Sequence, residues 1–267
     1  MTFQPVLPLG GYAGWRFLQR TLDTQQATFN QSAPVKRVTD HFRETIGQIR
    51  TADDLVKDRT LLQVALGAFG LDDDINNTYF IKRILSDGTT SSDALANKLS
   101  DKRYAAFARE FGFGEGELPR TGLTFFANKL TGLYEKKQFE RAVGDQDNDL
   151  RSALNLSSGL GEIVKNAASN DARWFLIMGN PPVRAVFETA LGLPSSLARL
   201  DLDQQLDNFK TRAQSTFGTD RVADLATPEQ EEKLVRLFLI RSEANAAAAT
   251  SAGSIALTLL QSAPRLI

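Results

Sequence analysis

Apolar residues recur three, four or seven positions apart along most of the chain, and this spacing constrains the fold more than any other sequence feature. Residues at these intervals share one face of an α-helix, whereas a half-buried strand alternates apolar and polar residues. The clearest pattern lies in residues 53–113, where Leu55, Leu62, Leu66 and Phe69 are expected on one helix face. No segment shows a convincing strand pattern, so the sequence predicts an all-α, multi-helix array.

A glycine followed by an apolar residue marks the expected end of two helices, at Gly70-Leu71 and at Gly192-Leu193. Glycine enters the left-handed conformation that ends a helix without a Cβ clash, and the apolar residue folds back onto the helix. Val64 and Ala68 precede the first pair at the same spacing as Val186 and Ala190 precede the second. Two explanations remain open: an internal duplication, or the general likeness of helices that end in this way.

The helix after Gly70 is expected to begin in the Asp72–Asp74 run, because carboxylates near a helix start accept hydrogen bonds from free backbone N–H groups. Its buried side is expected to comprise Ile75, Tyr79, Phe80 and Ile84. Further upstream, Thr51 lies just before two aspartates and is expected to act as an N-cap.

Residues 112–122, GFGEGELPRTG, are rich in glycine and contain a proline, which is typical of a linker. We therefore expect an N-terminal helical half in residues 1–111 and a C-terminal helical half in residues 123–267. A single continuous domain is the alternative.

A long final helix is expected from Pro228, and no charged residue follows Glu243 until Arg265. That window has about the length of a membrane span, but it consists mostly of Ala, Ser and Thr and is not predicted to be one. Small and apolar residues recur in it three or four positions apart, at Ala246, Ala249, Gly253, Ala256 and Leu260. We interpret these residues as a contact stripe for a protein partner or a second copy of the chain. The alternative is a helix docked on its own domain.

The composition excludes several classes of protein. The 31 basic and 32 acidic residues nearly cancel without long blocks, so no nucleic-acid surface is predicted. The absence of cysteine rules out disulfides, thiolate catalysis and cysteine-ligated metal sites. The first residues lack the basic and apolar regions of a signal peptide, and no integral membrane segment is predicted.

The sequence predicts no catalytic residue, no cofactor-binding residue and no metal ligand. His41 is the single histidine and has no partner set for a metal, so we expect it to be structural or on the surface. Two acidic runs, Asp72–Asn76 and Asp145–Asp149, lack the turn glycine and the bidentate glutamate of a calcium loop. They are expected to be helix caps or solvated loops.

The run ADDLVKDRTLLQVALGAFGLDDD, then FIKRILSDG and ALANKLSDKRYAAFAREFGF, resembles a bacterial family of proteins of unknown function. The matching residues are Asp54, Leu55, Asp58, Ala65, Leu66, Ala68, Phe69, Gly70, Leu71, Leu85, Asn97, Leu99, Asp101, Arg103 and Tyr104. Members of that family are commonly encoded among flagellar genes of swimming bacteria, and the resemblance implies this context. It implies no catalytic residue.

The sequence and the resemblance together predict a soluble, non-enzymatic protein-binding or assembly protein associated with the flagellum. Its expected location is the cytoplasm, or outside it by the flagellar export route without a cleaved signal. The alternative is a small-ligand-binding protein or an enzyme with its site in a crevice between the two helical halves.

Overall fold

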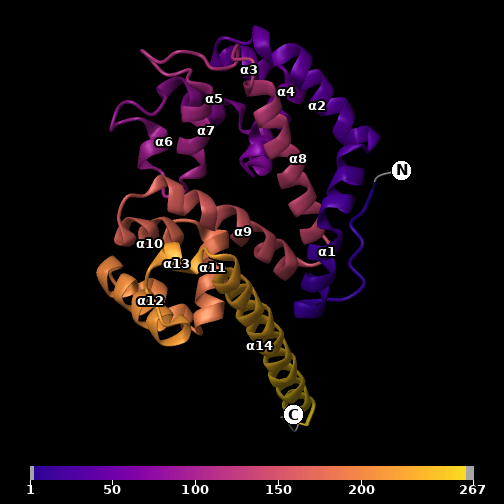
Figure 1. Ribbon diagram of the computed structural model, residues 1–267, viewed down its shortest axis with the longest axis vertical. Coiled ribbons are helices and arrows are strands. Elements are labelled where there is room, and N and C mark those ends of the chain that lie inside the picture. Colours follow the sequence, from indigo (N-terminus) through magenta and orange to yellow (C-terminus); the bar gives the residue numbers. More distant parts are fainter. Residues whose placement is uncertain (1–2, 263–267) are drawn as a thin grey trace, which may run out of the picture. The chain divides into compact units, whose positions relative to one another are not determined.

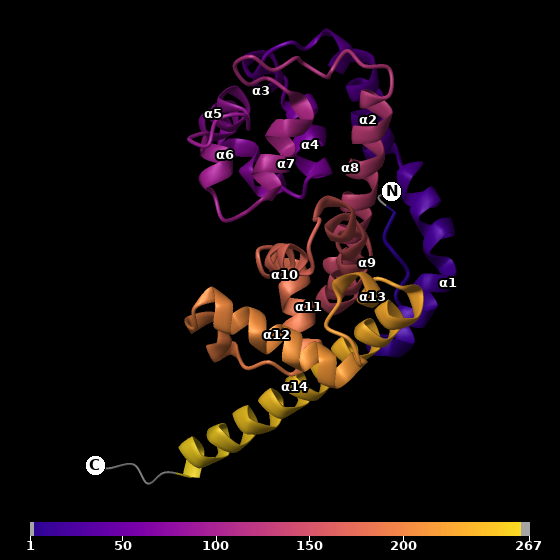
Figure 2. The same cartoon turned by 60° about the vertical axis from the view of Figure 1, so that its left-hand side comes forward.

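The computed structural model describes residues 3–262, and the side chains of these residues except those of residue 157 and residues 249–262. The described residues form α-helices joined by turns and three short 3₁₀ helices, and they contain no strand (Figures 1 and 2). The expected all-α, multi-helix array is therefore confirmed.

The chain separates into two compact units. The N-terminal unit contains Leu18–Gln146 and the segment before Pro8, and the C-terminal unit contains Pro8–Phe17 and the chain from Asp147 onward. Helix α1 (Gly11–Asn30) belongs to both, because its first two turns fall in the C-terminal unit and the remainder falls in the N-terminal unit.

The N-terminal unit is built around one buried helix, α4, which packs against α2, α3 and α8. Leu61, Leu62, Val64 and Leu66 of α4 are almost wholly removed from solvent. The elements of this unit after α1 are α2 (Ala33–Thr45), η1 (Ile46–Gln48), α3 (Ala52–Lys57), α4 (Arg59–Ala68), η2 (Asp72–Asn76), α5 (Thr78–Asp87), α6 (Leu95–Lys98), α7 (Arg103–Phe111) and α8 (Phe126–Gly144).

The expected single helix through Leu55 and Leu62 is wrong, because the helix is interrupted at Asp58, between α3 and α4. Asp58 has an extended backbone, and its carboxylate accepts hydrogen bonds from the N–H groups of Thr60 and Leu61 at 2.9 and 3.0 Å. It therefore caps a new helix, α4. Thr51 caps α3 as expected, in a reciprocal capping box with Asp54.

The expected burial of Tyr79 is also wrong, because its side chain is largely exposed. The acidic run forms the 3₁₀ helix η2, and α5 begins only at Thr78. This later start changes which residues face inward, so that Ile81, Ile84 and Leu85 form the buried side.

Residues 112–122 lie inside the N-terminal unit, and the division of the chain falls after Gln146. The Arg120 N–H donates to the Phe111 carbonyl at 3.0 Å, and the buried Thr121 hydroxyl donates to the Ile49 carbonyl at 2.5 Å. This segment is thus fastened to α7 and to the end of η1.

The C-terminal unit has a buried central helix of its own, α11, which packs against α9, α10, α12 and α14. Val183, Val186 and Phe187 of α11 are buried, and Trp174 of α10 packs edge-on against Phe187. The elements of this unit after α1 are α9 (Asn148–Asn166), α10 (Asn170–Met178), α11 (Pro181–Leu191), η3 (Ser195–Arg199), α12 (Leu202–Phe217), α13 (Val222–Leu225) and α14 (Pro228–Ser262).

The central helices α4 and α11 end in the same way, as their sequences predict. Gly70 and Gly192 have φ angles of 68° and 64°. The Leu71 N–H donates to the Leu66 carbonyl, and the Leu193 N–H donates to the Glu188 carbonyl. These bonds span five residues and define a Schellman motif in each unit. Each central helix also packs against a long helix that follows it, α8 or α14, so the two units share this part of their architecture.

Candidate functional site

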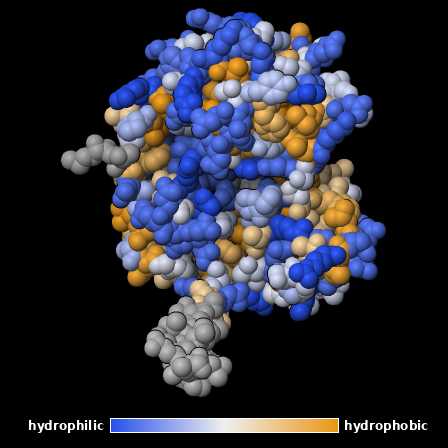
Figure 3. All heavy atoms as spheres, turned by 180° about the vertical axis from the view of Figure 1, so that it is seen from behind, coloured by the Kyte–Doolittle hydropathy of each residue, from blue (hydrophilic) through white to orange (hydrophobic). Residues whose placement is uncertain are grey.

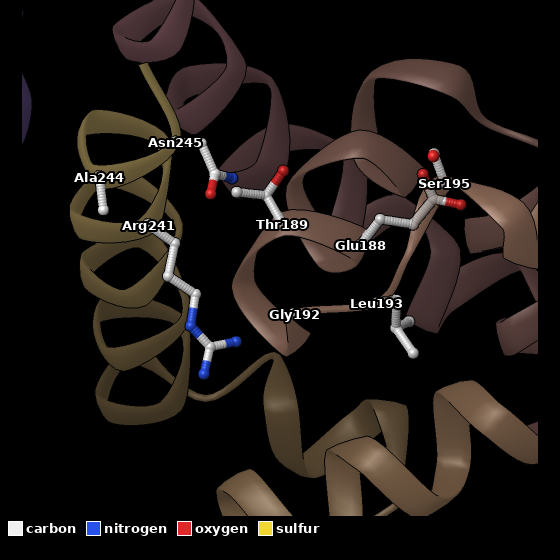
Figure 4. Close-up of a pocket in the computed structure, with 8 residues that line it drawn as sticks. All are labelled: Glu188, Thr189, Gly192, Leu193, Ser195, Arg241, Ala244 and Asn245. Atoms are coloured by element: carbon white, nitrogen blue, oxygen red, sulfur yellow. The ribbon is translucent and has the colours of Figure 1, made fainter. Parts of the chain in front are cut away.

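A depression of about 500 Å³ lies at the C-terminal end of α11, within the C-terminal unit (Figure 4). It is lined from α11 and the turn after it, from the start of η3, and from the middle of α14. The lining residues are Glu188, Thr189, Gly192, Leu193, Ser195, Arg241, Ala244 and Asn245.

The floor of this pocket is made by the end of α11. Gly192 adopts the left-handed conformation, and its N–H donates to the Thr189 carbonyl at 3.1 Å. A Cβ atom at this position would lie 2.9 Å from Arg241 Nη1, which is closer than ordinary packing allows. A glycine is therefore needed here both for the positive φ and for the approach of the arginine.

Arg241 forms the wall of the pocket on α14. Its Nη1 donates to the Ala190 carbonyl at 2.6 Å, and its side chain is only partly exposed. The carbonyls of the last helical turn have no partner within the helix, and a cation there also suits the negative end of the helix dipole. The neighbouring Ser242 hydroxyl donates to Asp149 on α9 at 2.6 Å. These two bonds fix this part of α14 against α9 and α11.

Glu188 brings a carboxylate to the opposite side of the pocket, where it is already paired. Arg184 Nε donates to Glu188 at 2.7 Å, and Arg184 Nη2 donates to the Gln205 amide oxygen at 2.8 Å. Gln205 is buried and in turn donates to the Leu200 carbonyl at 2.7 Å. This network neutralises the carboxylate and holds the start of α12 against α11.

The lining residues of the pocket are mostly polar. Arg241 and Asn245 offer N–H donors, and Thr189 and Ser195 offer hydroxyls, which suit a ligand with acceptor oxygens. Glu188 is the carboxylate among these lining residues, and Arg184 Nε already donates to it at 2.7 Å. Across the part of the chain that the structure describes, no group of three or more acidic or histidine side chains is placed to hold a metal ion.

His41 lies in the N-terminal unit, where its Nε2 is 2.8 Å from Asp58 Oδ2. Both side chains are partly exposed. Partial burial favours a higher pKa for Asp58, but the hydrogen bonds from Leu61 N–H and His41 outweigh it and lower the pKa below its usual value. The pair joins α2 to the start of α4, which is a structural position.

The acidic runs do not form calcium loops. Asp147 accepts hydrogen bonds from the N–H groups of Asp149 and Leu150 and caps α9. Asp74 accepts from the Tyr104 hydroxyl at 2.5 Å and from the Asn77 amide at 2.8 Å. Both runs are occupied by local capping and by contacts between helices.

The contact stripe expected on the final helix lies on α14, just beyond the pocket. Ala246 is exposed, one residue after the pocket-lining Asn245. The side chains of Ala249, Gly253, Ala256 and Leu260 lie outside the described residues. No local sequence pattern marks Arg241, Asn245 or Glu188 as site residues, because only folding brings α14 to the end of α11. The helix stop at Gly192-Leu193 was the one local signal of this site.

On the face of the molecule in Figure 3, hydrophobic residues are scattered through a mainly hydrophilic surface. Among the described residues, no helix is both long enough and apolar enough to cross a membrane.

The fold and the pocket define a class: all-α proteins of two units, each built on a buried central helix that ends in a left-handed glycine. The chain belongs to the family described as "Protein of unknown function (DUF1217)", whose model matches residues 68–230. It is also similar to the X-ray crystal structure of protein AGR_C_984 from Agrobacterium tumefaciens, with 26% identity and a TM-score of 0.69. That similarity covers 90% of this chain and 98% of the other. No curated protein matches the chain.

Proposed function

We propose that the protein acts by binding another protein, as a non-enzymatic assembly component associated with the flagellum, and that α14 carries the contact. The observation that supports this proposal is the length of α14. α14 runs for 35 residues, whereas α8, which packs on the central helix of the other unit, runs for 19.

The first half of α14 is held firmly. Leu234, Val235 and Leu239 are buried, and Glu232 accepts hydrogen bonds from Tyr12 at 2.7 Å and Trp15 at 3.3 Å on α1. These contacts hold the first turns of α14 against α1. The hydrogen bond from Ser242 to Asp149 holds the middle of α14 against α9.

Residues 243–248 of α14 are all exposed. From there the helix continues to Ser262, a further distance of roughly 30 Å at 1.5 Å per residue. Its sequence there contains Ile255, Leu257, Leu259 and Leu260 and no charged residue. Most helical stability comes from packing of an apolar face, so a partner for this stretch is expected.

The flagellar context rests on the resemblance to a family commonly encoded among flagellar genes of swimming bacteria. It agrees with an assembly role, and it makes motility the appropriate functional measurement. A location in the cytoplasm or export by the flagellar route both fit this role.

Truncation tests the proposal directly. A chain that ends at Asn245 keeps the buried part of α14 and the pocket, so it should fold, but it should lose partner capture and self-association. Light scattering, pull-down from the parent bacterium and swimming of the corresponding strain measure these effects. Leu260→Glu in the full chain should reproduce the loss, whereas the neighbouring Gln261→Glu serves as the matched control. Unchanged assembly and swimming in the truncated protein would overturn the proposal.

A second candidate function is the binding of a small molecule, which the pocket beside Arg241 supports. A pocket of this size lies within the range that small-molecule ligands occupy. The expected ligand carries acceptor oxygens that face Arg241 and Asn245. Native mass spectrometry of the purified protein should then show an added mass that Asn245→Ala reduces, and the absence of any such mass after expression in the parent bacterium would contradict it.

A further inference from the structure

The loop between α7 and α8, residues 112–125, runs across the N-terminal unit (Figure 2) and presents three large apolar side chains to solvent. Leu118 is 84% exposed, Phe125 is 57% exposed and Leu123 is 45% exposed. Isolated exposed apolar residues are common on protein surfaces, but three within eight consecutive residues are a concentrated feature.

The backbone of this loop is fixed. The N–H groups of Arg120, Leu123 and Phe126 donate at 3.0 Å to the carbonyls of Phe111, Arg120 and Leu123, respectively. The Glu117 carboxylate accepts from the Thr89 N–H at 3.0 Å and from the Thr90 hydroxyl at 2.9 Å. Since these bonds hold the loop in place, the apolar side chains are exposed by an ordered backbone, and little ordering entropy opposes binding.

Gly114 also anchors the loop. A Cβ atom on it would lie 2.7 Å from the Gly88 Cα atom, so two glycines allow the loop backbone to pass directly over the end of α5. Phe113 packs against the hydrophobic core on the same side. The loop therefore partly buries Phe113, while Leu118, Leu123 and Phe125 are exposed.

Two arginines accompany the exposed apolar residues. The guanidinium of Arg50 lies over Gly122, with Nη2 3.5 Å from the position of a Cβ atom there, and Arg120 is exposed within the loop. Arg50 Nη1 donates to the carbonyls of Gly47 and Ile49 at 2.6 and 2.9 Å. In the described part of the chain, neither guanidinium forms an ion pair with a carboxylate. By contrast, Lys129 in the first turn of α8 is paired with Glu110 at 2.6 Å.

We propose that this loop is a docking surface for an acidic amphipathic peptide segment of a partner protein. Apolar side chains of the segment would cover Leu118, Leu123 and Phe125, and its carboxylates would pair with Arg120 and Arg50. Arginine and aromatic residues are the types that contribute most at such interfaces, and arginine pairs carboxylates in a bidentate manner. The surface lies in the N-terminal unit, so the inference stands apart from the proposed role of α14.

An anionic membrane is a weaker match for the same residues. Each basic residue near such a surface contributes little by itself, and stable attachment takes clusters of several. Here there are two arginines, the exposed Glu115 opposes them in the same loop, and the loop contains no Trp or Tyr. Two arginines are too few for a membrane but are enough to pair one or two carboxylates of a peptide, so the charges match a peptide better.

Selection from a displayed library of random short peptides tests this inference on the full-length protein. The selected peptides should combine Asp or Glu with Leu, Ile or Phe, and their affinity should fall as salt is added. Leu118→Ser with Phe125→Ser, and separately Arg120→Glu, should each weaken binding at least about tenfold.

Two matched controls lie in the C-terminal unit. Leu202 is 60% exposed, and Arg199 is exposed, so Leu202→Ser and Arg199→Glu should leave peptide binding unchanged. Circular dichroism checks that every variant is folded, and vesicles with anionic lipid should not bind the protein.

The inference is overturned if selection yields no peptide, if the peptides are basic, if they bind the loop variants as tightly as the parent, or if the loop binds vesicles instead. Truncation at Asn245 should not alter this binding, which separates it from the α14 proposal.

Discussion

Arg241 donates a hydrogen bond from Nη1 to the Ala190 carbonyl at 2.6 Å, and this bond joins α14 to the last turn of α11. The N-terminal unit has a counterpart, because Arg103 Nη1 donates to the Gly70 carbonyl at 2.5 Å, just beyond the end of α4. An arginine thus closes the C-terminal end of the central helix in each unit, from α14 in one and from α7 in the other.

Replacing Arg241 by methionine should destabilise the C-terminal unit. The variant keeps an apolar side chain of similar reach but leaves the Ala190 carbonyl without its charged donor. Hydrogen bonds to charged groups contribute about 1.5–3 kcal/mol, and we expect a loss in this range in the free energy of unfolding. Urea denaturation measures it, with the exposed Arg199→Met as the control. Equal stability of the two variants would show that the bond contributes nothing.

Alanine at Gly70 and alanine at Gly132 should change stability in opposite directions. Gly70 has a φ of 68°, and an L-residue in that conformation costs about 1–2 kcal/mol. Gly132 lies inside α8 with open space at its Cβ position, where alanine should stabilise by about 0.5–1 kcal/mol. Both sites belong to the N-terminal unit, so thermal or urea unfolding compares them directly. A stabilising Gly70→Ala would contradict the left-handed helix end.

Tyr104 should ionise only at an unusually high pH. Partial burial and the hydrogen bond to Asp74 raise its pKa from 10.0 to about 12. Because the raised pKa favours the neutral phenol in the folded protein, its contribution to stability is complete below the unfolded value of 10.0 and is lost as the pH rises through about 12.

The measurement is an ultraviolet titration of the parent and of Tyr104→Phe, with circular dichroism recorded at each pH. The absorbance that disappears in the variant should have its midpoint near the raised pKa, and Tyr79→Phe should leave that phase in place. If the absorbance change that Tyr104→Phe removes has its midpoint at the ordinary tyrosine pKa, the burial of Tyr104 and its contact with Asp74 are contradicted.

Asp58→Ala should destabilise the N-terminal unit by about 0.5–2 kcal/mol, the usual cost of losing an N-cap. The native pKa of Asp58 is lowered, so its contribution is present above the ordinary value of 3.8 and is lost as the pH falls through the lowered native value. The difference between parent and variant should therefore shrink in acid.

His41→Gln should have a much smaller effect near neutral pH, because its pairing with Asp58 is partly exposed and such pairs contribute roughly 0–1 kcal/mol. It should also leave swimming unchanged. A large loss of motility with normal folding would indicate a chemical role for His41.

The sequence was sufficient to predict helix ends and starts where local interactions decide them. The ends of α4 and α11 follow from Gly70 and Gly192, and α14 begins at Pro228 as expected. It was insufficient at Asp58, where apolar spacing continues across a break, because Leu55 and Leu62 are both buried although they belong to different helices. The periodicity reports which residues face the core and does not report whether the backbone between them stays helical.

The sequence by itself determined the helical class, several helix ends and the long final helix, because hydrogen bonds between residues three to five apart and the freedom of glycine decide these features. Tertiary structure alone decided the limits of the two units, the exposed side of α5, the fastening of residues 112–125 and the pocket at α11. These depend on pairs such as Arg241 with Ala190, which are 51 residues apart, and Thr121 with Ile49, which are 72 residues apart. Such pairs form only when the whole unit packs, and no local pattern in the chain encodes them.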